Sequence, residues 1–233
     1  MCDHCGCEQA EAVTDNSSKT EDLNHDLMQA NRTAAQHNRN MLERAGVSAI
    51  NLISSPGAGK TTLLVETLKQ LQGRFPTSVV EGDQHTERDA NRIRAVGVPA
   101  VQIQTGSACH LDAQMVHNAL HQLPLEDGGL LFIENVGNLI CPAHFELGET
   151  AVVALLSVTE GDDKPLKYPH IFHQADLLVI TKTDLLPYVD FNVDGCVTYA
   201  RRLNPDIAVI QLSAKTGAGI EDWLNWLCQL QGD

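Results

Sequence analysis

The stretch SSPGAGKTT (54–62) limits the possible folds of this chain more than any other segment. It directly follows the short apolar run VSAINLIS and leads into TTLLVETLKQLQ, whose apolar residues recur at helical spacing. Glycines allow successive backbone N–H groups to curl around an anion, and the start of a helix adds its dipole. The segment therefore predicts a phosphate-binding loop between a buried strand and a helix.

The side chains of this loop suit a nucleoside triphosphate and its Mg²⁺ ion. Lys60 is expected to reach the β- and γ-phosphates, and the Thr61 hydroxyl is expected to hold Mg²⁺. The usual pattern G-x-x-x-x-G-K-[ST] begins with glycine, whereas this chain has Ser54 there. A glycine-rich turn that contains Lys-Thr by chance is the alternative, and the flanking strand and helix argue against it. The expected nucleotide contacts of the loop are Gly57, Ala58, Gly59, Lys60, Thr61 and Thr62.

Short apolar runs alternate with helical patterns from Val47 to the end of the chain. Seven runs are typical of strands: VSAINLIS, TSVVEGD, AVQIQT, GLLFIEN, AVVALLSV, DLLVIT and IAVIQLSA. Continuous Val/Ile/Leu strands joined by helices indicate a mostly parallel sheet covered on both faces. We therefore expect an α/β fold of the P-loop NTPase class, with about seven strands flanked by helices, over residues 47–233.

Two segments precede this domain. Residues 1–20 contain almost no large apolar side chain, so a flexible cysteine-rich tail is expected, because nothing offsets the entropy cost of ordering it. Residues 21–46 are predicted to form a helix that ends near Gly46 and packs on the domain or on a second copy. Its apolar positions are Leu23, Leu27, Met28, Met41 and Leu42.

Two loops after later strands indicate that the base is guanine. The motif TKTD follows the strand DLLVIT, and the Asp184 carboxylate can accept hydrogen bonds from guanine N1–H and the exocyclic amine. The usual motif is NKxD, so Thr181 is expected to weaken the bridge between loops that asparagine makes. The motif SAKTG follows the last strand, where the Ala214 amide can donate to guanine O6. The expected base contacts are Lys182, Asp184, Ser213, Ala214 and Lys215.

Two acidic stretches are predicted to complete the phosphate end of the site. The strand TSVVEGD ends at Asp83, a candidate Mg²⁺ ligand, and leads into the possible first switch QHTERDANR. The motif E-N-V-G is a variant of the D-x-x-G switch, in which Glu134 lies near the metal and the Gly137 N–H senses the γ-phosphate. Capping is the alternative role of both acids. The expected catalytic residues are Lys60, Asp83, Glu134 and Gly137, and no residue stands out as the group that activates water.

Cys109, His110 and Cys141 follow two of the predicted strands. Because loops after parallel strands emerge at one edge of a sheet, two thiolates and an imidazole could converge on a soft ion such as Zn²⁺ or Ni²⁺. Cys141 comes four residues after Gly137, so movement of that switch would couple nucleotide state to metal affinity. A fourth position is left for His144, water or a second subunit. The alternative is that the three residues are unrelated.

The first seven residues, MCDHCGC, contain three cysteines and one histidine. If the initiator Met is removed, the amine of Cys2 and the thiolates of Cys2, Cys5 and Cys7 could form a square-planar N/S₃ set that suits low-spin Ni²⁺. A zinc knuckle without a fourth ligand, iron–sulfur ligation and an ordinary reactive tail are the alternatives. An odd total of seven cysteines, clustered with histidines, favours metal ligation in a reducing compartment over a disulfide framework.

The charge and hydropathy of the chain disfavour several partners. There are 16 Lys and Arg residues against 30 Asp and Glu residues, and the net charge of −14 would repel nucleic acid and anionic membranes. No stretch approaches the roughly 18 to 20 apolar residues of a membrane span, and the N-terminus does not resemble a signal peptide. We therefore expect a cytoplasmic protein without nucleic-acid or membrane partners.

Several other side chains are expected to have no role in the site. His117 and His121 are four residues apart on a predicted helix, opposite its apolar face, and are expected to be solvated. Cys196 and Cys228 lie within helical patterns and are expected to be packing residues.

The motifs resemble, over essentially the whole chain, those of the HypB family of nickel-incorporation GTPases. They are MCDHCGC, SSPGAGKTT, EGDQHTERDANR, TGSACHLDA, ENVGNLICPA, VTEGDDKPLKYP, TKTDLLP and SAKTG. The resemblance implies a SIMIBI-class GTPase that forms GDP and phosphate and delivers nickel to the large-subunit precursor of [NiFe]-hydrogenase. It also implies GTP-linked homodimers, a HypA-like metallochaperone as partner and, in some cases, the prolyl isomerase SlyD.

The same resemblance implies roles for particular residues. Cys109, His110 and Cys141 would form a Zn/Ni site near the dimer interface. A lysine in the run EGDDKPLKYP, either Lys164 or Lys167, would reach the nucleotide of the partner subunit.

Other functions stay open at this point. A urease-type accessory GTPase of the UreG family has a Cys-Pro-His metal motif and lacks the cysteine-rich tail, whereas this chain has Cys141-Pro142-Ala143-His144. Nickel storage or buffering would favour long histidine runs, but only His4 lies near the tail thiols. A small-molecule kinase would prefer ATP over GTP and would contradict the role given to Asp184.

Overall fold

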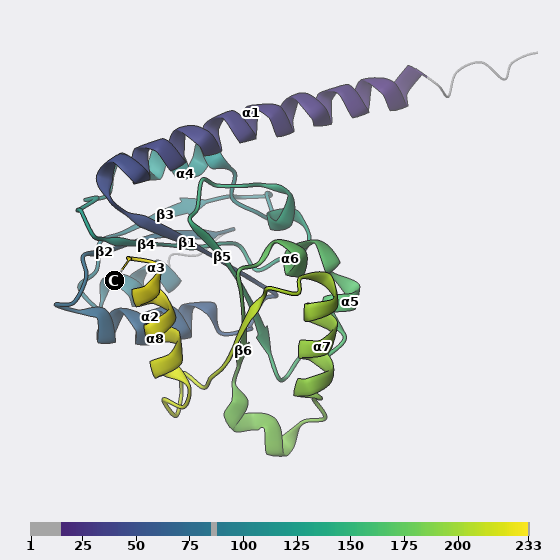
Figure 1. The fold of residues 1–233 in the computed structure, drawn as a ribbon. Coiled ribbons are helices and arrows are strands. Elements are labelled where there is room, and N and C mark those ends of the chain that lie inside the picture. The colour runs from purple at the N-terminus through teal and green to yellow at the C-terminus, as the bar shows by residue number, and fades with distance from the viewer. Residues whose placement is uncertain (1–14, 85–87, 233) are drawn as a thin grey trace, which may run out of the picture.

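The computed structural model describes residues 15–84 and 88–232, which form a seven-stranded sheet between two layers of helices (Figure 1). The strands are β1 (Ser48–Ser54), β2 (Thr77–Asp83), β3 (Ala100–Gln104), β4 (Leu130–Glu134), β5 (Ala151–Ser157), β6 (Leu177–Thr181) and β7 (Ala208–Gln211). Their order is β3-β2-β4-β1-β5-β6-β7, and every neighbouring pair is parallel. The predicted α/β fold with a parallel sheet of about seven strands is confirmed.

Helices connect the strands and cover both faces of the sheet. They are α1 (Asp15–Ala45), α2 (Lys60–Leu71), α3 (Arg88–Arg94), α4 (Ala113–Leu120), α5 (Lys164–Lys167), α6 (Pro169–Gln174), α7 (Val193–Leu203) and α8 (Ile220–Gln229), with 3₁₀ turns η1 (Cys141–His144) and η2 (Thr183–Tyr188). Among the residues that the structure describes, none of these helices combines the length and apolar character of a membrane span.

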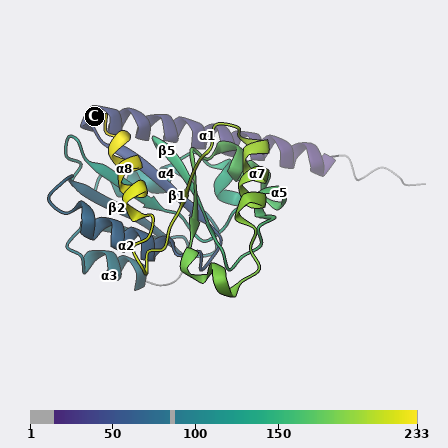
Figure 2. The same cartoon turned by 60° about the horizontal axis from the view of Figure 1, so that its bottom comes forward.

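Alternate residues of the strands build two cores on opposite faces of the sheet. In β1, Ile50 and Leu52 pack with the apolar sides of α2, α3 and α8, whereas Ala49 packs with α1 and α4, and Ile53 with α6 and α7. Figures 1 and 2 show the α1 layer and the α2–α3 layer on opposite sides of the sheet. This sandwich places the loops after all seven strands at one edge, where the candidate site lies.

Helix α1 differs from the expected helix at its start. It begins at Asp15, before the expected residue 21, and its N-terminal half extends past the edge of the sheet (Figures 1 and 2). Leu27, expected on the apolar face, is 64% exposed, whereas Leu42 is buried. The helix ends where expected, because Gly46 adopts a φ of 65° that other residues rarely take.

Two buried asparagines fix α1 to the domain. Asn38 Nδ2 donates to the carbonyl oxygens of Ala113 and Leu147, at 2.8 and 2.9 Å. Asn31 accepts a hydrogen bond from the Ala113 N–H at 2.8 Å and donates to the Glu146 carbonyl at 2.9 Å. The last turns of α1 therefore pack on α4 and on the segment after η1.

The parts of the chain outside the described residues include two predicted features. Residues 1–14 contain the proposed tail ligands Cys2, Cys5 and Cys7, and residues 85–87 belong to the predicted first switch. These predictions stay untested by the geometry.

Candidate functional site

The loop between β1 and α2 has the backbone that phosphate binding requires. Gly57 and Gly59 have φ angles of 77° and 100°, in the left-handed region that favours glycine. Lys60 opens α2, and its Nζ donates to Ser54 Oγ at 2.9 Å across the loop. Burial lowers the pKa of Lys60, and the nearby Glu134 carboxylate opposes that shift. Ser54, which departs from the usual motif, thus holds the lysine in place by a hydrogen bond.

The phosphate end of the site is a cavity of about 530 Å³ beside this loop. It is lined by all four expected catalytic residues: Lys60, Asp83, Glu134 and Gly137. A Cβ atom added to Gly137 would lie 3.0 Å from atoms of Pro56 in the loop, so the switch lies so close to the phosphate loop that a side chain there would require the loop to shift. The positions of these four residues are therefore consistent with one site, formed by β1, β2, β4 and the loops that follow them.

The sequence motifs do not identify Glu81 as a residue of this cavity, although it lines the cavity beside Glu134. The two residues are partners in the β2–β4 register and are only 2% and 4% exposed. Burial, reinforced by the neighbouring Glu134, raises the pKa of Glu81 to about 8, and burial raises the pKa of Glu134 to about 7. The sequence signal is a carboxylate inside the apolar strand TSVVEGD.

Oxygen atoms that suit Mg²⁺ gather at this cavity. Thr61 Oγ1 donates to Glu134 Oε1 at 2.6 Å, and carboxylate oxygens of Glu81, Asp83 and Asp89 lie within 4.8 Å of one another. Within residues 15–84 and 88–232, the buried Oε2 atoms of Glu81 and Glu134 have no hydrogen-bond partner. Because Mg²⁺ prefers hard oxygen ligands and water, this donor set fits the ion.

Without nucleotide and Mg²⁺, the free energy of unfolding is expected to fall as the pH rises from 4.5 to about 8. Over that interval Glu81 keeps its proton in the folded state but loses it in the unfolded chain, so the folded state binds more protons and stability decreases with pH. Glu81→Gln should remove the contribution of Glu81 to this fall and stabilise the protein by a few kcal/mol near pH 8.

Urea unfolding in the presence of a chelator, repeated across this pH interval, measures the effect. Glu134 still titrates in the Glu81→Gln variant, so the slope should persist below about pH 7 and flatten above it. Glu43→Gln, at an exposed position of α1, is the control and should follow the parent protein. Equal slopes for all three proteins would show that Glu81 is not protonated as described.

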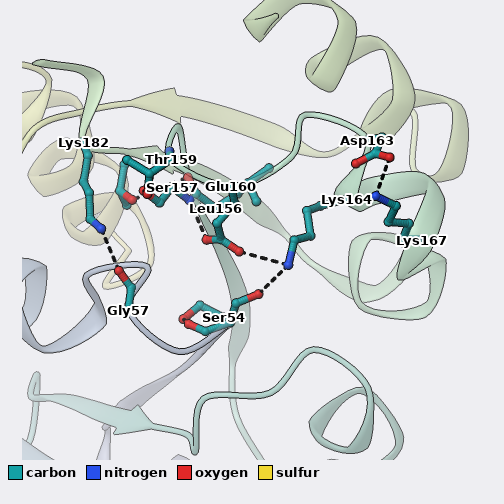
Figure 3. Close-up of polar contacts among 12 residues, drawn as sticks. Ser54, Gly57, Leu156, Ser157, Thr159, Glu160, Asp163, Lys164, Lys167 and Lys182 are labelled. Atoms are coloured by element: carbon teal, nitrogen blue, oxygen red, sulfur yellow. Dashed lines mark hydrogen bonds and ion pairs between the residues drawn. The ribbon is translucent and has the colours of Figure 1, made fainter. Parts of the chain in front are cut away.

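A second cavity of about 240 Å³ adjoins the phosphate cavity at Gly59, Thr62 and Lys182. It is lined by every expected base contact: Lys182, Asp184, Ser213, Ala214 and Lys215. Ser213 Oγ donates to Asp184 Oδ1 at 2.7 Å, which leaves the second carboxylate oxygen for another partner. Lys182 Nζ donates to the Gly57 carbonyl at 2.7 Å (Figure 3). The loops after β6 and β7 therefore meet the phosphate loop around a base-sized space.

Thr181 of the TKTD loop contacts the phosphate loop directly. Thr181 is 3% exposed, and its hydroxyl donates to the Ala58 carbonyl at 2.7 Å. Threonine thus makes a direct bridge from the base loop to the phosphate loop, in place of the asparagine of the usual motif. The two loops are therefore bridged at this position although the asparagine is missing.

Cys109, His110 and Cys141 lie together at the same edge of the sheet. Cys109 Sγ is 3.0 Å from Cys141 Sγ and 3.8 Å from His110 Nδ1, and one ligand atom from each residue lies within 4.8 Å of the others. All three are half-buried, and burial lowers the pKa of His110, which favours the neutral imidazole that metal binding needs. Two sulfurs and one nitrogen suit Zn²⁺ or Ni²⁺.

Two asparagines join these ligands to the nucleotide switch. Asn135 follows Glu134 directly, is buried, and accepts a hydrogen bond from the Leu111 N–H at 3.1 Å. Asn138 Nδ2 donates to the Cys109 carbonyl at 3.3 Å. Because Cys109 and Leu111 flank His110, the metal-ligand loop is hydrogen-bonded on both sides of the histidine, to Asn135 of the E-N-V-G switch and to Asn138 directly after it.

The two lysines of the run EGDDKPLKYP have different partners (Figure 3). Lys164 Nζ lies 3.1 Å from Glu160 Oε2 and donates to Ser55 Oγ of the phosphate loop at 3.0 Å. Lys167 pairs with Asp163 at 2.6 Å, and its side chain is 60% exposed. Of the two candidates for a contact with the partner subunit's nucleotide, Lys164 is the one that lies at the phosphate loop of its own chain.

Among the residues that were expected to lie outside the site, one differs from the prediction in its exposure to solvent. Cys196 is buried in the core between α6 and α7, as expected, and Cys228 is half-buried on α8. His117, however, is half-buried and lies 2.9 Å from Asn38 Oδ1 of α1. The expectation that His117 is solvated is wrong, because α1 covers that side of α4.

Comparison with known proteins assigns a family. Residues 48–211 match the family described as "CobW/HypB/UreG, nucleotide-binding domain". The hydrogenase maturation factor HypB of Azotobacter chroococcum mcd 1 is 54% identical over 227 residues, which cover 97% of this chain and 74% of that protein. HypB of Escherichia coli (strain K12) is 55% identical over 202 residues, which cover 87% of this chain and 70% of that protein.

Two solved structures agree with the sequence relatives. HypB from Archaeoglobus fulgidus has a TM-score of 0.82 and 39% identity, covering 88% of this chain and all of that one. HypB from Helicobacter pylori in complex with nickel has a TM-score of 0.81 and 40% identity, covering 87% and 95% of the two chains. This chain therefore belongs to the HypB family of hydrogenase maturation factors, nickel-related GTPases with the CobW/HypB/UreG nucleotide-binding domain.

Proposed function

We propose that the protein is a GTP-hydrolysing nickel metallochaperone that delivers nickel to the large-subunit precursor of [NiFe]-hydrogenase. The observation that carries this proposal is the pair of hydrogen bonds from Asn135 and Asn138, which tie the Cys109–His110 loop to the nucleotide switch. A switch that moves on hydrolysis would move these ligands as well, and so change the affinity for the cargo. Membership of the HypB family supports the nature of that cargo.

The nucleotide reaction in this proposal is hydrolysis of GTP to GDP and phosphate. Lys60 and the backbone of the phosphate loop would balance the phosphate charge, and the Gly137 N–H would contact the γ-phosphate. Thr61 and Asp83, with Glu81 and Glu134 beside them, would hold Mg²⁺ directly or through water. When bound, Mg²⁺ supplies charge neutralisation at the β- and γ-phosphates.

Nickel binding is proposed at two places. Cys109, His110 and Cys141 would hold Ni²⁺ or Zn²⁺ within the GTPase domain, and the solved nickel complex of the Helicobacter pylori relative supports a nickel role. The cysteine-rich tail, with Cys2, Cys5 and Cys7, would hold Ni²⁺ in a square-planar set. The tail ligands lie outside the described residues, so that assignment rests on the sequence alone.

The proposed partners follow from the family and from the surface around the site. Ile140, next to Cys141, is 57% exposed, and Leu166, between the two lysines, is 52% exposed. Exposed apolar side chains at these places support a GTP-linked homodimer that forms across the metal and Lys164 side of the molecule. A HypA-like metallochaperone, the large-subunit precursor and SlyD are the further proposed partners, in the cytoplasm.

Nickel transfer between purified proteins tests this function. The nickel-loaded chain is mixed with the large-subunit precursor and a HypA-like partner, with GTP or with a non-hydrolysable analogue. We expect transfer with GTP only, and we expect Lys60→Ala to lower GTP turnover about a hundredfold or more and to abolish transfer. Transfer that is equal with the analogue would show that hydrolysis does not drive delivery, and nickel that stays bound during turnover would favour storage over delivery.

A further inference from the structure

Helix α4 carries two histidines one turn apart whose rings meet at its C-terminal end. His117 Nε2 lies 3.2 Å from His121 Nε2, and the rings are nearly perpendicular with centroids 4.7 Å apart. His121 is the C-terminal cap residue of α4 and is exposed, whereas His117 is half-buried. Two ring nitrogens at this distance share either one proton or one cation.

The proton arrangement of His117 follows from its hydrogen bond to α1. Asn38 is fully buried, and its Nδ2 donates to the carbonyl oxygens of Ala113 and Leu147. Its Oδ1 must therefore be the acceptor from His117 Nδ1, at 2.9 Å. In the neutral imidazole the proton is then on Nδ1, so the Nε2 lone pair of His117 points toward His121.

This arrangement is the one found in metal-bound histidines. A ligating imidazole commonly donates its other N–H to an oxygen atom, which fixes the tautomer and the ring orientation, and Asn38 Oδ1 supplies that oxygen here. Two nitrogen ligands that are each about 2.0–2.1 Å from one ion lie roughly 3 Å apart, close to the separation of these Nε2 atoms. The carbonyl end of the α4 dipole at His121 also favours a positive charge.

We propose that His117 and His121 form a further binding site for a divalent transition-metal ion, Ni²⁺ or Zn²⁺, on the α1–α4 side of the molecule. The two Nε2 atoms are its protein ligands, Asn38 orients the inner histidine, and water completes the coordination. The site is separate from the Cys109, His110 and Cys141 cluster, although α4 begins shortly after that cluster along the chain. It goes beyond the proposed delivery function, because it binds a metal ion in addition to the ions that the cysteine ligands and the nucleotide site hold.

The direct test counts metal equivalents in a protein from which the proposed thiolate ligands are removed. In this background Cys2, Cys5 and Cys7 are changed to Ala, and Cys109 and Cys141 to Ser. Equilibrium dialysis against Ni²⁺ and against Zn²⁺ should give one bound equivalent in the background. His121→Ala should lose that equivalent, and His25→Ala, at a 76% exposed side chain of α1, should keep it.

Unchanged stoichiometry in His121→Ala would overturn the proposal and leave the pair as a hydrogen bond between two side chains. Because the multiple cysteine variant is at risk of misfolding, the protein with all its cysteines provides a second measurement. With the thiolate sites saturated, further Zn²⁺ should shift the ¹⁵N resonances of Nε2 in both His117 and His121 and leave His117 Nδ1 protonated. Unshifted resonances at both residues would also contradict the site.

Discussion

Asp184→Asn is expected to lower the affinity for GTP about a hundredfold or more and to raise the affinity for xanthosine triphosphate. The carboxylate in the base cavity accepts from guanine N1–H and the exocyclic amine, and an amide in its place puts a donor against that amine. Xanthine carries a carbonyl oxygen where guanine has the amine, so it restores a hydrogen bond to the new amide. The exocyclic amine of guanine would be buried without an acceptor, which accounts for the size of the loss in GTP affinity.

In the structure, this substitution can change the contact with the base without removing the hydrogen bond from Ser213. Ser213 Oγ donates to Asp184 Oδ1, and asparagine keeps an acceptor oxygen for that bond while it replaces only the other oxygen. Asp190→Asn, at an exposed position after η2, is the matched control and should bind GTP like the parent protein. Competition between a fluorescent guanine nucleotide and the two triphosphates gives the affinities. Unchanged preference for GTP in Asp184→Asn would mean that another group reads the base.

Cys141→Ser is expected to abolish metal binding at the internal cluster. Cys141 Sγ is 3.0 Å from Cys109 Sγ, so both thiolates face the same point, and a hydroxyl is a much poorer ligand for Ni²⁺ or Zn²⁺ than a thiolate. In protein that lacks the tail thiols, one nickel equivalent should disappear together with its thiolate-to-nickel absorption band. The histidine pair on α4 has no sulfur and contributes nothing to that band.

Cys228→Ser is the matched control for this change. Cys228 is also half-buried but lies on α8, near Arg74, on the other face of the sheet. The control should retain the band at full intensity. An unchanged band in Cys141→Ser would mean that Cys109 and His110 bind nickel without Cys141, which would contradict a site made of all three residues.

The fold and the main site residues are predictable from the sequence because the sheet is parallel. Each motif follows an apolar run, and loops after parallel strands meet at one edge, so Lys60, Glu134 and Asp184 could be placed from order along the chain alone. The approach of Cys109 to Cys141 follows from the same rule. Such residues depend on strand topology more than on the details of side-chain packing.

The residues that sequence did not place correctly depend on contacts across distant segments. The local sequence marks Glu81 as a carboxylate inside an apolar strand, but its position in the phosphate cavity depends on its register with Glu134 in a distant segment. Thr181 bridges to the phosphate loop because its hydroxyl reaches a carbonyl 123 positions away. His117 is held by Asn38, 79 positions earlier, on a helix whose docking side was not predictable from its weak apolar pattern.

Nickel titration of the protein in its two nucleotide states tests the central claim most directly. Cys2, Cys5 and Cys7 are changed to Ala, and Ni²⁺ affinity at the internal cluster is measured with GDP and with a non-hydrolysable GTP analogue. Coupling through Asn135 and Asn138 predicts affinities that differ by about fivefold or more. Asn138→Ala, which removes the bond to the Cys109 carbonyl, should reduce that difference. Equal nickel affinity in the two nucleotide states would contradict the account.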